Sequence, residues 1–227
     1  MFGQNPVAPN RSTKTTFLVK SIFDTIQGEG PYAGYCATFI RFGGCNLKCT
    51  FCDTDFTTDL DEMSADEICE YLLHDSAGNT MLVFTGGEPM LQNLALLIKA
   101  ITRQLPHVTH VQIETAGTVW PEEFNYVVHG VRPTIDIVVS PKTPKVNTSV
   151  SHYAIAWKYI VKKGMLMGMD GIPLNHAVPL GKRPVYIQPM DEQDPIKNTA
   201  NVEFAKYVVL KHRHRLSLQI HKIIGVE

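Results

Sequence analysis

The sequence predicts an α/β fold, a partial and open TIM-like (β/α) barrel of about six strands. Apolar strand segments alternate with helical segments along the chain, and this alternation implies a parallel sheet. Nearly every predicted strand ends in a polar or glycine-rich motif, and in barrel enzymes this end of the strands carries the active site. The strand count is lower than the eight of a closed barrel and the first helices are short, so we expect an open barrel.

The composition fits a globular chain with its own core. The chain has 227 residues, of which 44% are hydrophobic, and a net charge of −1. This hydrophobic content argues against disorder, and the near-neutral charge gives no electrostatic argument for nucleic acid or a membrane surface. No apolar run approaches membrane-spanning length. We expect residues 1–16 to form an N-terminal arm and residues 17–227 a single core domain.

Cysteine usage indicates a reducing compartment. The five cysteines are clustered rather than dispersed, which is unlike a secreted disulfide framework. Residues 1–16 are polar and lack the apolar core of a signal peptide. We therefore expect a cytoplasmic protein.

In the first half of the chain, strands and helices alternate. Ser64 and Glu67 form a capping box, so a helix should begin at Ala65, and Cys69 within it should pack in the core. Arg41 is unusual, because an arginine in an apolar strand needs an anionic or acceptor partner. The expected strands are 17–26, 37–42, 81–85 and 108–115, and the expected helices are 65–74 and 91–105.

The second half continues the alternation. A β-branched, apolar run at 135–139, interrupted only by Asp136, predicts a strand covered on both faces. Four glycines and two prolines at 163–182 predict a loop. Further strands are expected at 158–161, 185–188 and 216–220, and helices at 121–126 and 195–212. Residues 153–157 are expected to close a further short helix.

Three cysteines, Cys45, Cys49 and Cys52, lie within eight residues with the spacing C-x3-C-x2-C. Thiolates this close in one loop favour a zinc ion or an iron–sulfur cluster. A structural zinc site needs four protein ligands, whereas three cysteines leave a four-iron cluster with one iron open. The alternatives are a chance cluster or a zinc loop that borrows Cys36, Cys69 or a histidine.

This spacing resembles that of the radical S-adenosylmethionine (SAM) enzymes, and from about Phe17 to the last residue the chain resembles the 7-carboxy-7-deazaguanine synthases. The resemblance implies a [4Fe–4S] cluster whose open iron binds SAM and yields a 5′-deoxyadenosyl radical. It further implies that 6-carboxy-5,6,7,8-tetrahydropterin is converted to 7-carboxy-7-deazaguanine, with ring contraction and loss of ammonia. The matching stretches are Thr25–Gly30, Phe39–Arg41, the cysteine loop through Thr54, Phe84–Pro89, Gln112–Thr115, Val139–Lys142, Gln188–Pro189 and Arg215–Lys222.

The resemblance also implies residue roles. Cys45, Cys49 and Cys52 would hold the cluster, and Thr54 would ligate Mg²⁺, a hard cation that takes oxygen ligands. The expected SAM-binding residues are Phe51, Cys52, Asp53, Gly86, Gly87, Glu88, Ser140, Pro141, Lys142, Gln188, Pro189, Met190 and Asp191. The expected substrate-binding residues are Ile26, Gln27, Gly28, Glu29, Arg41, Thr85, Glu114, His221 at a strand end and Glu227 through its terminal carboxylate. No side-chain acid or base is expected to be catalytic.

Two other functions compete with this interpretation. A radical SAM activase that abstracts hydrogen from a partner's glycine would share the cysteine motif and the Gly-Gly-Glu-Pro segment. A zinc-stabilised binding module would carry out no chemistry at all. For the favoured interpretation, the expected partners are the small-molecule pterin substrate and an electron donor such as flavodoxin, and the resemblance implies a homodimer. From the charge and the hydropathy, neither nucleic acid nor a membrane is expected as a partner.

Overall fold

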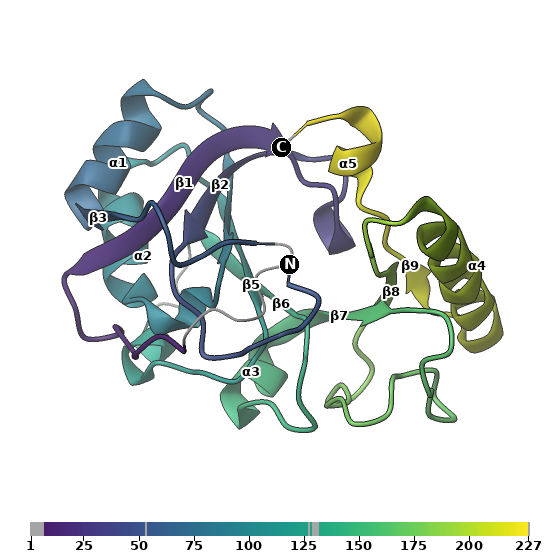
Figure 1. Ribbon diagram of the computed structural model, residues 1–227. Coiled ribbons are helices and arrows are strands. Elements are labelled where there is room, and N and C mark those ends of the chain that lie inside the picture. Colours follow the sequence, from purple (N-terminus) through teal and green to yellow (C-terminus); the bar gives the residue numbers. More distant parts are fainter. Residues whose placement is uncertain (1–6, 53, 127, 129–131, 227) are drawn as a thin grey trace. The chain divides into compact units, whose positions relative to one another are not determined.

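Two sets of strands and their helices make up the chain in the computed structural model, which describes residues 7–52, 54–126, 128 and 132–226 (Figure 1). The first unit comprises Met1–Ile26, Cys36–Thr115 and Val119–Asp136, and the second comprises Gln27–Tyr35, Ala116–Thr118 and Ile137–Glu227. Each unit has its own strands, helices and buried residues.

The first unit is built on strands in the order β3-β1-β2-β4-β5. These are β1 (Thr16–Ile26), β2 (Cys36–Phe42), β3 (Asp61–Ser64), β4 (Met81–Gly86) and β5 (His110–Thr115). β1 pairs antiparallel with β2 and β3, whereas β2, β4 and β5 are parallel. The carboxyl ends of three parallel strands therefore meet at one edge of this sheet.

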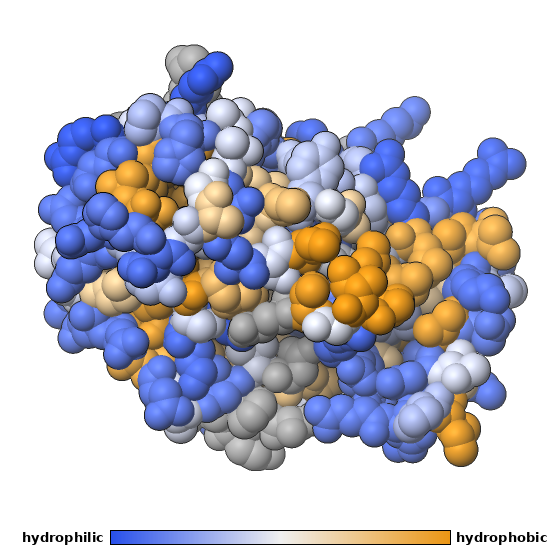
Figure 2. Space-filling view, turned by 90° about the horizontal axis from the view of Figure 1, so that it is seen from above, coloured by the Kyte–Doolittle hydropathy of each residue, from blue (hydrophilic) through white to orange (hydrophobic). Residues whose placement is uncertain are grey.

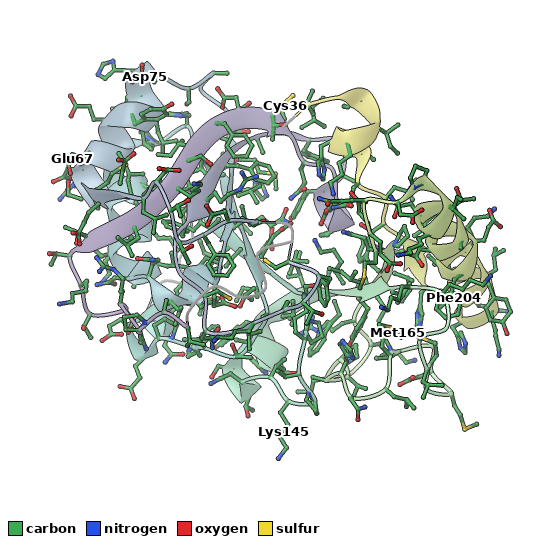
Figure 3. All side chains as sticks on the ribbon, viewed as in Figure 1. Cys36, Glu67, Asp75, Lys145, Met165 and Phe204 are labelled. Carbon is green, nitrogen blue, oxygen red and sulfur yellow. The ribbon has the colours of Figure 1, made fainter. Side chains whose placement is uncertain are left out.

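Two helices of the first unit confirm the sequence signals. The capping box predicted at Ser64 and Glu67 is present at the start of α1 (Ala65–His74), and Cys69 is buried as expected. Figure 3 shows Glu67 and Asp75 toward opposite ends of this helix. α2 (Leu94–Gln104) packs against α1 and follows the short η2 (Pro89–Leu91), so the helix expected from residue 91 begins three residues later. Its N-cap is Asn93, whose side chain accepts a hydrogen bond from the backbone N–H of Leu96. The short helix expected at 121–126 is η3 (Glu122–Tyr126).

The second unit orders its strands as β6-β7-β8-β9, all parallel. They are β6 (Thr134–Val139), which passes from the first unit into the second after Asp136, β7 (Ala154–Val161), β8 (Val185–Pro189) and β9 (Arg215–Leu216). α4 (Pro195–His212) has the predicted bounds, is capped by Asp194, and packs on β7, β8 and β9. The remaining elements of this unit are η1 (Gly30–Tyr32), α3 (Thr148–Tyr153) and α5 (Ile220–Ile224).

Two expected elements were wrong. Residues 153–157 were expected to close a short helix, but only Tyr153 does so, as the last residue of α3. The next four residues belong to β7, because Ala154–Val161 is a mostly buried and mostly apolar run that suits a strand. The final strand expected at 216–220 reaches only Leu216, and α5 occupies Ile220–Ile224 instead. Leu216, Leu218 and Ile220 alternate with polar residues, and this alternation is what wrongly indicated a strand.

Six strands of five or more residues, β2, β4, β5, β6, β7 and β8, each run parallel to at least one neighbouring strand. This confirms the predicted α/β fold with a mostly parallel sheet. Across the described ranges, none of the helices combines the length and hydrophobicity needed to cross a bilayer.

Candidate active site

The cysteine loop of the first unit leaves β2 through two glycines that are fixed by backbone hydrogen bonds. The N–H of Gly43 donates to the carbonyl of Leu18 (2.9 Å), and that of Gly44 donates to the carbonyl of Phe56 on the far side of the loop (2.8 Å). The N-terminal arm also contacts the loop, because the N–H of Ala8 donates to the carbonyl of Cys45 (2.8 Å). The start of the loop is therefore held by hydrogen bonds to β1, to the far side of the loop and to the N-terminal arm.

The segment Gly86–Glu88 at the end of β4 is hydrogen-bonded to the start of the cysteine loop. The N–H of Gly87 donates to the carbonyl of Phe42 (3.0 Å), and the N–H of Glu88 donates to the carbonyl of Gly44 (2.9 Å). A Cβ on Gly87 would lie 1.9 Å from the carbonyl oxygen of Gly44, so a larger residue does not fit. The second glycine is thus needed for packing against the loop backbone, which is a separate reason from the SAM binding that the resemblance implied.

Glu88 is fully buried, and its carboxylate is held by hydrogen bonds within the first unit. Its Oε1 accepts hydrogen bonds from the hydroxyl of Thr115 (2.7 Å) and from the N–H of Met90 (3.1 Å). These contacts connect the ends of β4 and β5 directly behind the cysteine loop. Burial of a carboxylate requires such donors, so Thr115 stabilises the position of Glu88.

The cysteine side chains suit an iron–sulfur cluster by their chemistry. Cys45 is buried, whereas Cys49 and Cys52 are half-buried. Burial, together with the nearby charges of Glu88, Cys49 and Cys52, raises the pKa of the Cys45 thiol to about 11, so binding iron must release a proton from this group. The N–H of Leu47 points to the Cys45 sulfur at 3.4 Å, as backbone donors do toward cluster sulfurs.

No three His, Cys, Asp or Glu side chains of the described part of the chain are gathered around the position of a single metal ion. A cubane cluster binds each thiolate on a separate iron, so its ligands stand further apart than those of one ion. Phe51 and Thr54 lie half-buried in the loop, and the sulfur of Cys52 is 3.4 Å from the carbonyl oxygen of Thr54. Asp53 lies outside the described residues.

Three expected substrate-binding residues of the first unit lie on one face of its parallel strands. Arg41 on β2 is the register partner of Thr85 on β4, so their side chains project to the same side. Val83 is the partner of Gln112, and two residues further along each strand the same face carries Thr85 and Glu114. Arg41, Thr85 and Glu114 therefore form a polar row at the carboxyl ends of neighbouring strands.

Neighbouring side chains fix this polar row. The guanidinium carbon of Arg41 lies 4.9 Å from the centre of the Phe23 ring, a cation–π contact. The amide of Gln112 donates to Oε1 of Glu114 (2.9 Å), while the buried Oε1 of Gln112 has no hydrogen-bond partner among the described residues. The row thus combines a cation, a hydroxyl and a carboxylate, which are the groups needed to bind an anionic heterocycle with N–H donors.

In the second unit, the turn that follows β1 brings Gln27, Gly28 and Glu29 to the segment around α5. Gln27 is buried, and its Oε1 accepts from the N–H of Glu29 (3.0 Å), so its side chain shapes the turn itself. The carbonyl of Gly28 accepts from the N–H of Ile220 (3.2 Å), and a Cβ on Gly28 would lie 2.1 Å from the ring of His221. Ile26 ends β1 and belongs to the first unit.

Glu29 is the centre of a polar cluster in the second unit. Its Oε1 accepts from the amides of Gln188 (3.0 Å) and Gln219 (2.9 Å), and its Oε2 forms an ion pair with Lys158. Burial raises the pKa of Glu29, but the charge and hydrogen bond of Lys158, the hydrogen bond from Gln219 and the charge of His221 lower it from 4.5 to about 2. Glu29 is therefore ionised at neutral pH despite its burial.

The remaining expected SAM-binding residues lie at the ends of β6 and β8. Lys142 turns back and donates to both the carbonyl and the hydroxyl of Ser140 (2.6 Å each), and Pro141 between them is buried. The N–H of Met190, after Gln188 and Pro189, donates to the carbonyl of Val161 (2.8 Å). Asp191 accepts from Lys222, Asn198 and the N–H of Gln193, all at 2.8 Å.

Sequence reasoning placed most of these residues at strand ends, but it missed three of their partners. Lys158 lies in the apolar run of β7 and could have been found by the argument applied to Arg41, since a charge in such a strand needs a partner. Thr115 and Gln219 carry no comparable signal. His221 lies in α5 rather than at a strand end, and Glu227 lies outside the described residues.

Comparison with known proteins identifies the family. The family model described as Radical SAM superfamily matches residues 39–140. The 7-carboxy-7-deazaguanine synthase of Rickettsia prowazekii is 35% identical over 100% of this chain and 96% of its own, and that of Rhodospirillum rubrum is 31% identical over 100% of both. A solved structure described as that of QueE from Escherichia coli is 20% identical, with a TM-score of 0.65 over 92% of this chain and 96% of that chain.

The structural likeness to that protein agrees with the partial barrel that the sequence predicted. The activase and the zinc-stabilised binding module, which competed as interpretations of the cysteine loop, receive no support from these relatives. Because the relatives match at full length and share at least 30% of their residues with it, the chain belongs to the 7-carboxy-7-deazaguanine synthase family of radical SAM enzymes.

Proposed function

We propose that this protein converts 6-carboxy-5,6,7,8-tetrahydropterin to 7-carboxy-7-deazaguanine with loss of ammonia, as a radical SAM lyase in 7-deazapurine (queuosine-type) biosynthesis. The observation that carries the proposal is the polar row of Arg41, Thr85 and Glu114, which lies in the same unit as the cysteine loop. In a chain related at full length to 7-carboxy-7-deazaguanine synthases, this row provides the groups that such a substrate requires.

The protein's own residues have binding and orienting roles in this proposal. Cys45, Cys49 and Cys52 would hold the [4Fe–4S] cluster that the radical SAM family implies, and with bound SAM this cluster would supply the radical chemistry at C6 of the pterin. Arg41 pairs with the substrate carboxylate or ring carbonyl, since a guanidinium matches such acceptors. Glu29 and Glu114 accept N–H groups of the aminopyrimidine edge, and Thr85 and His221 complete the contacts.

The SAM contacts that we propose come from the strand ends. The Gly86–Glu88 segment, together with Ser140–Lys142 and Gln188–Asp191, presents backbone and polar side-chain groups beside the ends of β4, β6 and β8. Phe51 and Asp53 of the cysteine loop belong to the same set. Glu227 is also a proposed substrate contact.

We further propose that Mg²⁺ binds at Thr54 and steers the substrate carboxylate. Thr54 follows the third cysteine by two residues, and hydroxyl oxygen is a ligand that this hard cation accepts. A flavodoxin-type protein is the proposed electron donor, and the cytoplasm is the proposed location, since it protects an exposed cluster from oxygen.

A homodimer is the proposed assembly. α4 leaves Ile196, Tyr207 and Leu210 mostly exposed, and Figure 2 shows hydrophobic surface among hydrophilic residues on the face seen from above. Exposed hydrophobic groups of this kind favour association. Light scattering on the anaerobic protein should therefore give twice the mass of one chain, and the mass of a single chain would reject the dimer.

The proposed activity is tested by anaerobic cluster reconstitution, followed by addition of SAM and reductant with and without the carboxypterin. We expect the product to be the deazaguanine acid, identified by mass and ultraviolet spectrum, with little consumption of SAM. Cleavage of SAM without that product would retain the superfamily and reject the substrate. A Cys45→Ala, Cys49→Ala, Cys52→Ala variant provides the cluster-free control.

A further inference from the structure

Lys158 is a buried lysine for which the proposed function has no use. It lies in the middle of β7 between Trp157 and Tyr159, and only 5% of its surface is exposed. Its side chain projects to the same face as Val138, Ala156 and Tyr186, which form a buried apolar cluster. Burying an ammonium group is costly unless an opposite charge and good geometry compensate. The compensating group is Glu29, with which Lys158 forms an ion pair.

The carboxylate of Glu29 is oriented by three side chains from three separate elements. Lys158 on β7 contacts Oε2, while Gln188 on β8 and Gln219, the N-cap of α5, both donate to Oε1. Gln188 is itself fixed, because its side-chain oxygen Oε1 accepts a hydrogen bond from the hydroxyl of the buried Ser217 (3.2 Å). Lys158 and His221 are the charged groups of the second unit that lower the pKa of Glu29.

The acceptor positions of Glu29 limit what it can offer a ligand. A carboxylate has about four lone-pair positions, two on each oxygen. The two amides occupy both positions of Oε1, and Lys158 occupies one of the two on Oε2. A ligand N–H can therefore reach Oε2 without displacing a protein donor, whereas side-by-side acceptance of two N–H groups would require an amide to move.

We propose that Lys158 is a positioning residue for pterin binding, which keeps Glu29 charged and turned so that Oε2 accepts one N–H of the aminopyrimidine edge. The inference rests on the proposed function, in which Glu29 contacts that edge. It assigns to Lys158 an indirect role, because its ammonium acts on the substrate only through the carboxylate.

The test uses Lys158→Met, which keeps the length of the side chain and removes its charge. The dissociation constant for the carboxypterin is measured by anaerobic calorimetry on the cluster-loaded protein with SAM and without reductant. Without Lys158, burial raises the pKa of Glu29, so the carboxylate protonates at the lower end of the pH range. We expect the variant to bind about 10- to 100-fold more weakly than wild type at about pH 6, and the ratio to shrink toward about pH 8.

Two further variants separate positioning from a structural role. Lys158→Arg keeps the charge and should restore most of the affinity, whereas Lys99→Met, on an exposed face of α2, should leave binding unchanged. An affinity ratio that does not change with pH, or wild-type affinity in Lys158→Met, would overturn the proposal. If Lys158→Met does not fold, the double variant with Lys158→Met and Glu29→Gln, which removes both charges of the ion pair, is measured instead. Wild-type affinity of this double variant for the carboxypterin would also overturn the proposal.

A measurement without the pterin distinguishes failure of this inference from failure of the proposed function. If the wild type binds no pterin, the proposed substrate is rejected, and the effect of Lys158 is then determined from the unfolding temperature alone. A raised pKa of Glu29 in folded Lys158→Met means that this protein loses stability as the pH rises from about 5 to about 8, relative to wild type. If the unfolding temperature varies with pH in the same way in both proteins, Lys158 does not control the pKa of Glu29.

Discussion

At the scale of single residues, Glu88 illustrates how a buried carboxylate depends on donors from another strand. It follows two glycines at the end of β4 and is fully buried, and the hydroxyl that binds it belongs to Thr115 at the end of β5. The same carboxylate lies near Cys45, whose pKa it raises. Loss of one donor should therefore affect both the stability of the first unit and the geometry beside the cysteine loop.

Thr115→Val removes the hydroxyl donor while keeping the shape of the side chain. Because Glu88 would then lack one hydrogen bond in a buried position, we expect the free energy of unfolding to fall by about 1–3 kcal/mol. Guanidinium titration measures this loss, and iron content after reconstitution should fall with it. Thr134→Val on β6, where the side chain is exposed, is the control and should change stability by no more than about 0.5 kcal/mol. Equal stability of wild type and Thr115→Val would show that the hydroxyl is dispensable.

Thr54 gives a second prediction, this one about Mg²⁺. If its hydroxyl ligates the cation, Thr54→Ala should raise the Mg²⁺ concentration needed for half-maximal turnover by about tenfold, while Thr54→Ser stays near wild type. The assay is initial rate against Mg²⁺ concentration at saturating SAM. An unchanged Mg²⁺ dependence in Thr54→Ala would mean that the threonine serves only the loop, where its carbonyl oxygen lies near the sulfur of Cys52.

Some site residues could be predicted from the sequence because their position alone indicates a function. Arg41 in an apolar strand, and Glu114 just before the end of another, are unusual for a core and invite a ligand or a partner. The hydrogen-bond partners of the site residues could not be predicted in this way, because they lie far away along the chain. Gln219 reaches Glu29 across 190 residues, and Thr115 reaches Glu88 across 27. Such contacts depend on how strands align in the fold, which no local pattern of residues reveals.

At the scale of elements, α5 is a helix of five residues that depends on its connections. The N–H of Ile220 donates to the carbonyl of Gly28, and Lys222 forms an ion pair of 2.8 Å with Asp191 after β8. An isolated helix of this length is not stable in water, so these contacts hold it. Hydrogen bonds from Lys222, Gln193 and Asn198 outweigh burial and lower the pKa of Asp191 from 3.8 to about 2.

Lys222→Met should therefore change the acid stability in a defined direction. A carboxyl group whose pKa is lowered by folding adds stability above about pH 4, and this stability is lost as the pH falls through about 2. The variant should be less stable at neutral pH by no more than about 1 kcal/mol, and its difference from wild type should shrink between about pH 4 and pH 2. Urea titrations across this range measure it. Lys206→Met, which removes an exposed ion pair with Glu203 on α4, is the matched control.

Elements with strong local signals were predicted with their bounds, and elements without them were not. α1 has a complete capping box, and α4 begins at Pro195 after the capping Asp194 and ends at His212, before Arg213 in the left-handed conformation. β9 has two residues, and the alternating segment that contains it could equally be read as a longer strand. β7 begins at Ala154 directly after α3, so no turn residue marks the boundary.

At the scale of the whole molecule, the two units are joined by repeated passages of the chain. The chain passes between them after residues 26, 35, 115, 118 and 136, which makes five crossings, and the last falls inside β6. Independent unfolding of one unit would require β6 to lose half of its length while the other half stays paired. We therefore expect residues 17–227, which the sequence predicts to form a single core domain, to unfold cooperatively.

The two tryptophans of the chain provide a direct test, because there is one in each unit. Trp120 lies half-buried against the edge of Phe124 in the first unit, and Trp157 is fully buried on β7 in the second. Trp157→Phe leaves Trp120 as the sole reporter, and Trp120→Phe leaves Trp157. In each variant of the cluster-free chain, we expect the guanidinium midpoint from fluorescence to equal the midpoint from far-ultraviolet circular dichroism, because two-state unfolding gives coincident transitions for all probes.

The absolute midpoints will differ between the variants, since Trp157→Phe leaves space in the core, so the comparison is made within each variant. A fluorescence midpoint that departs from the dichroism midpoint in either variant would show that one unit unfolds before the other.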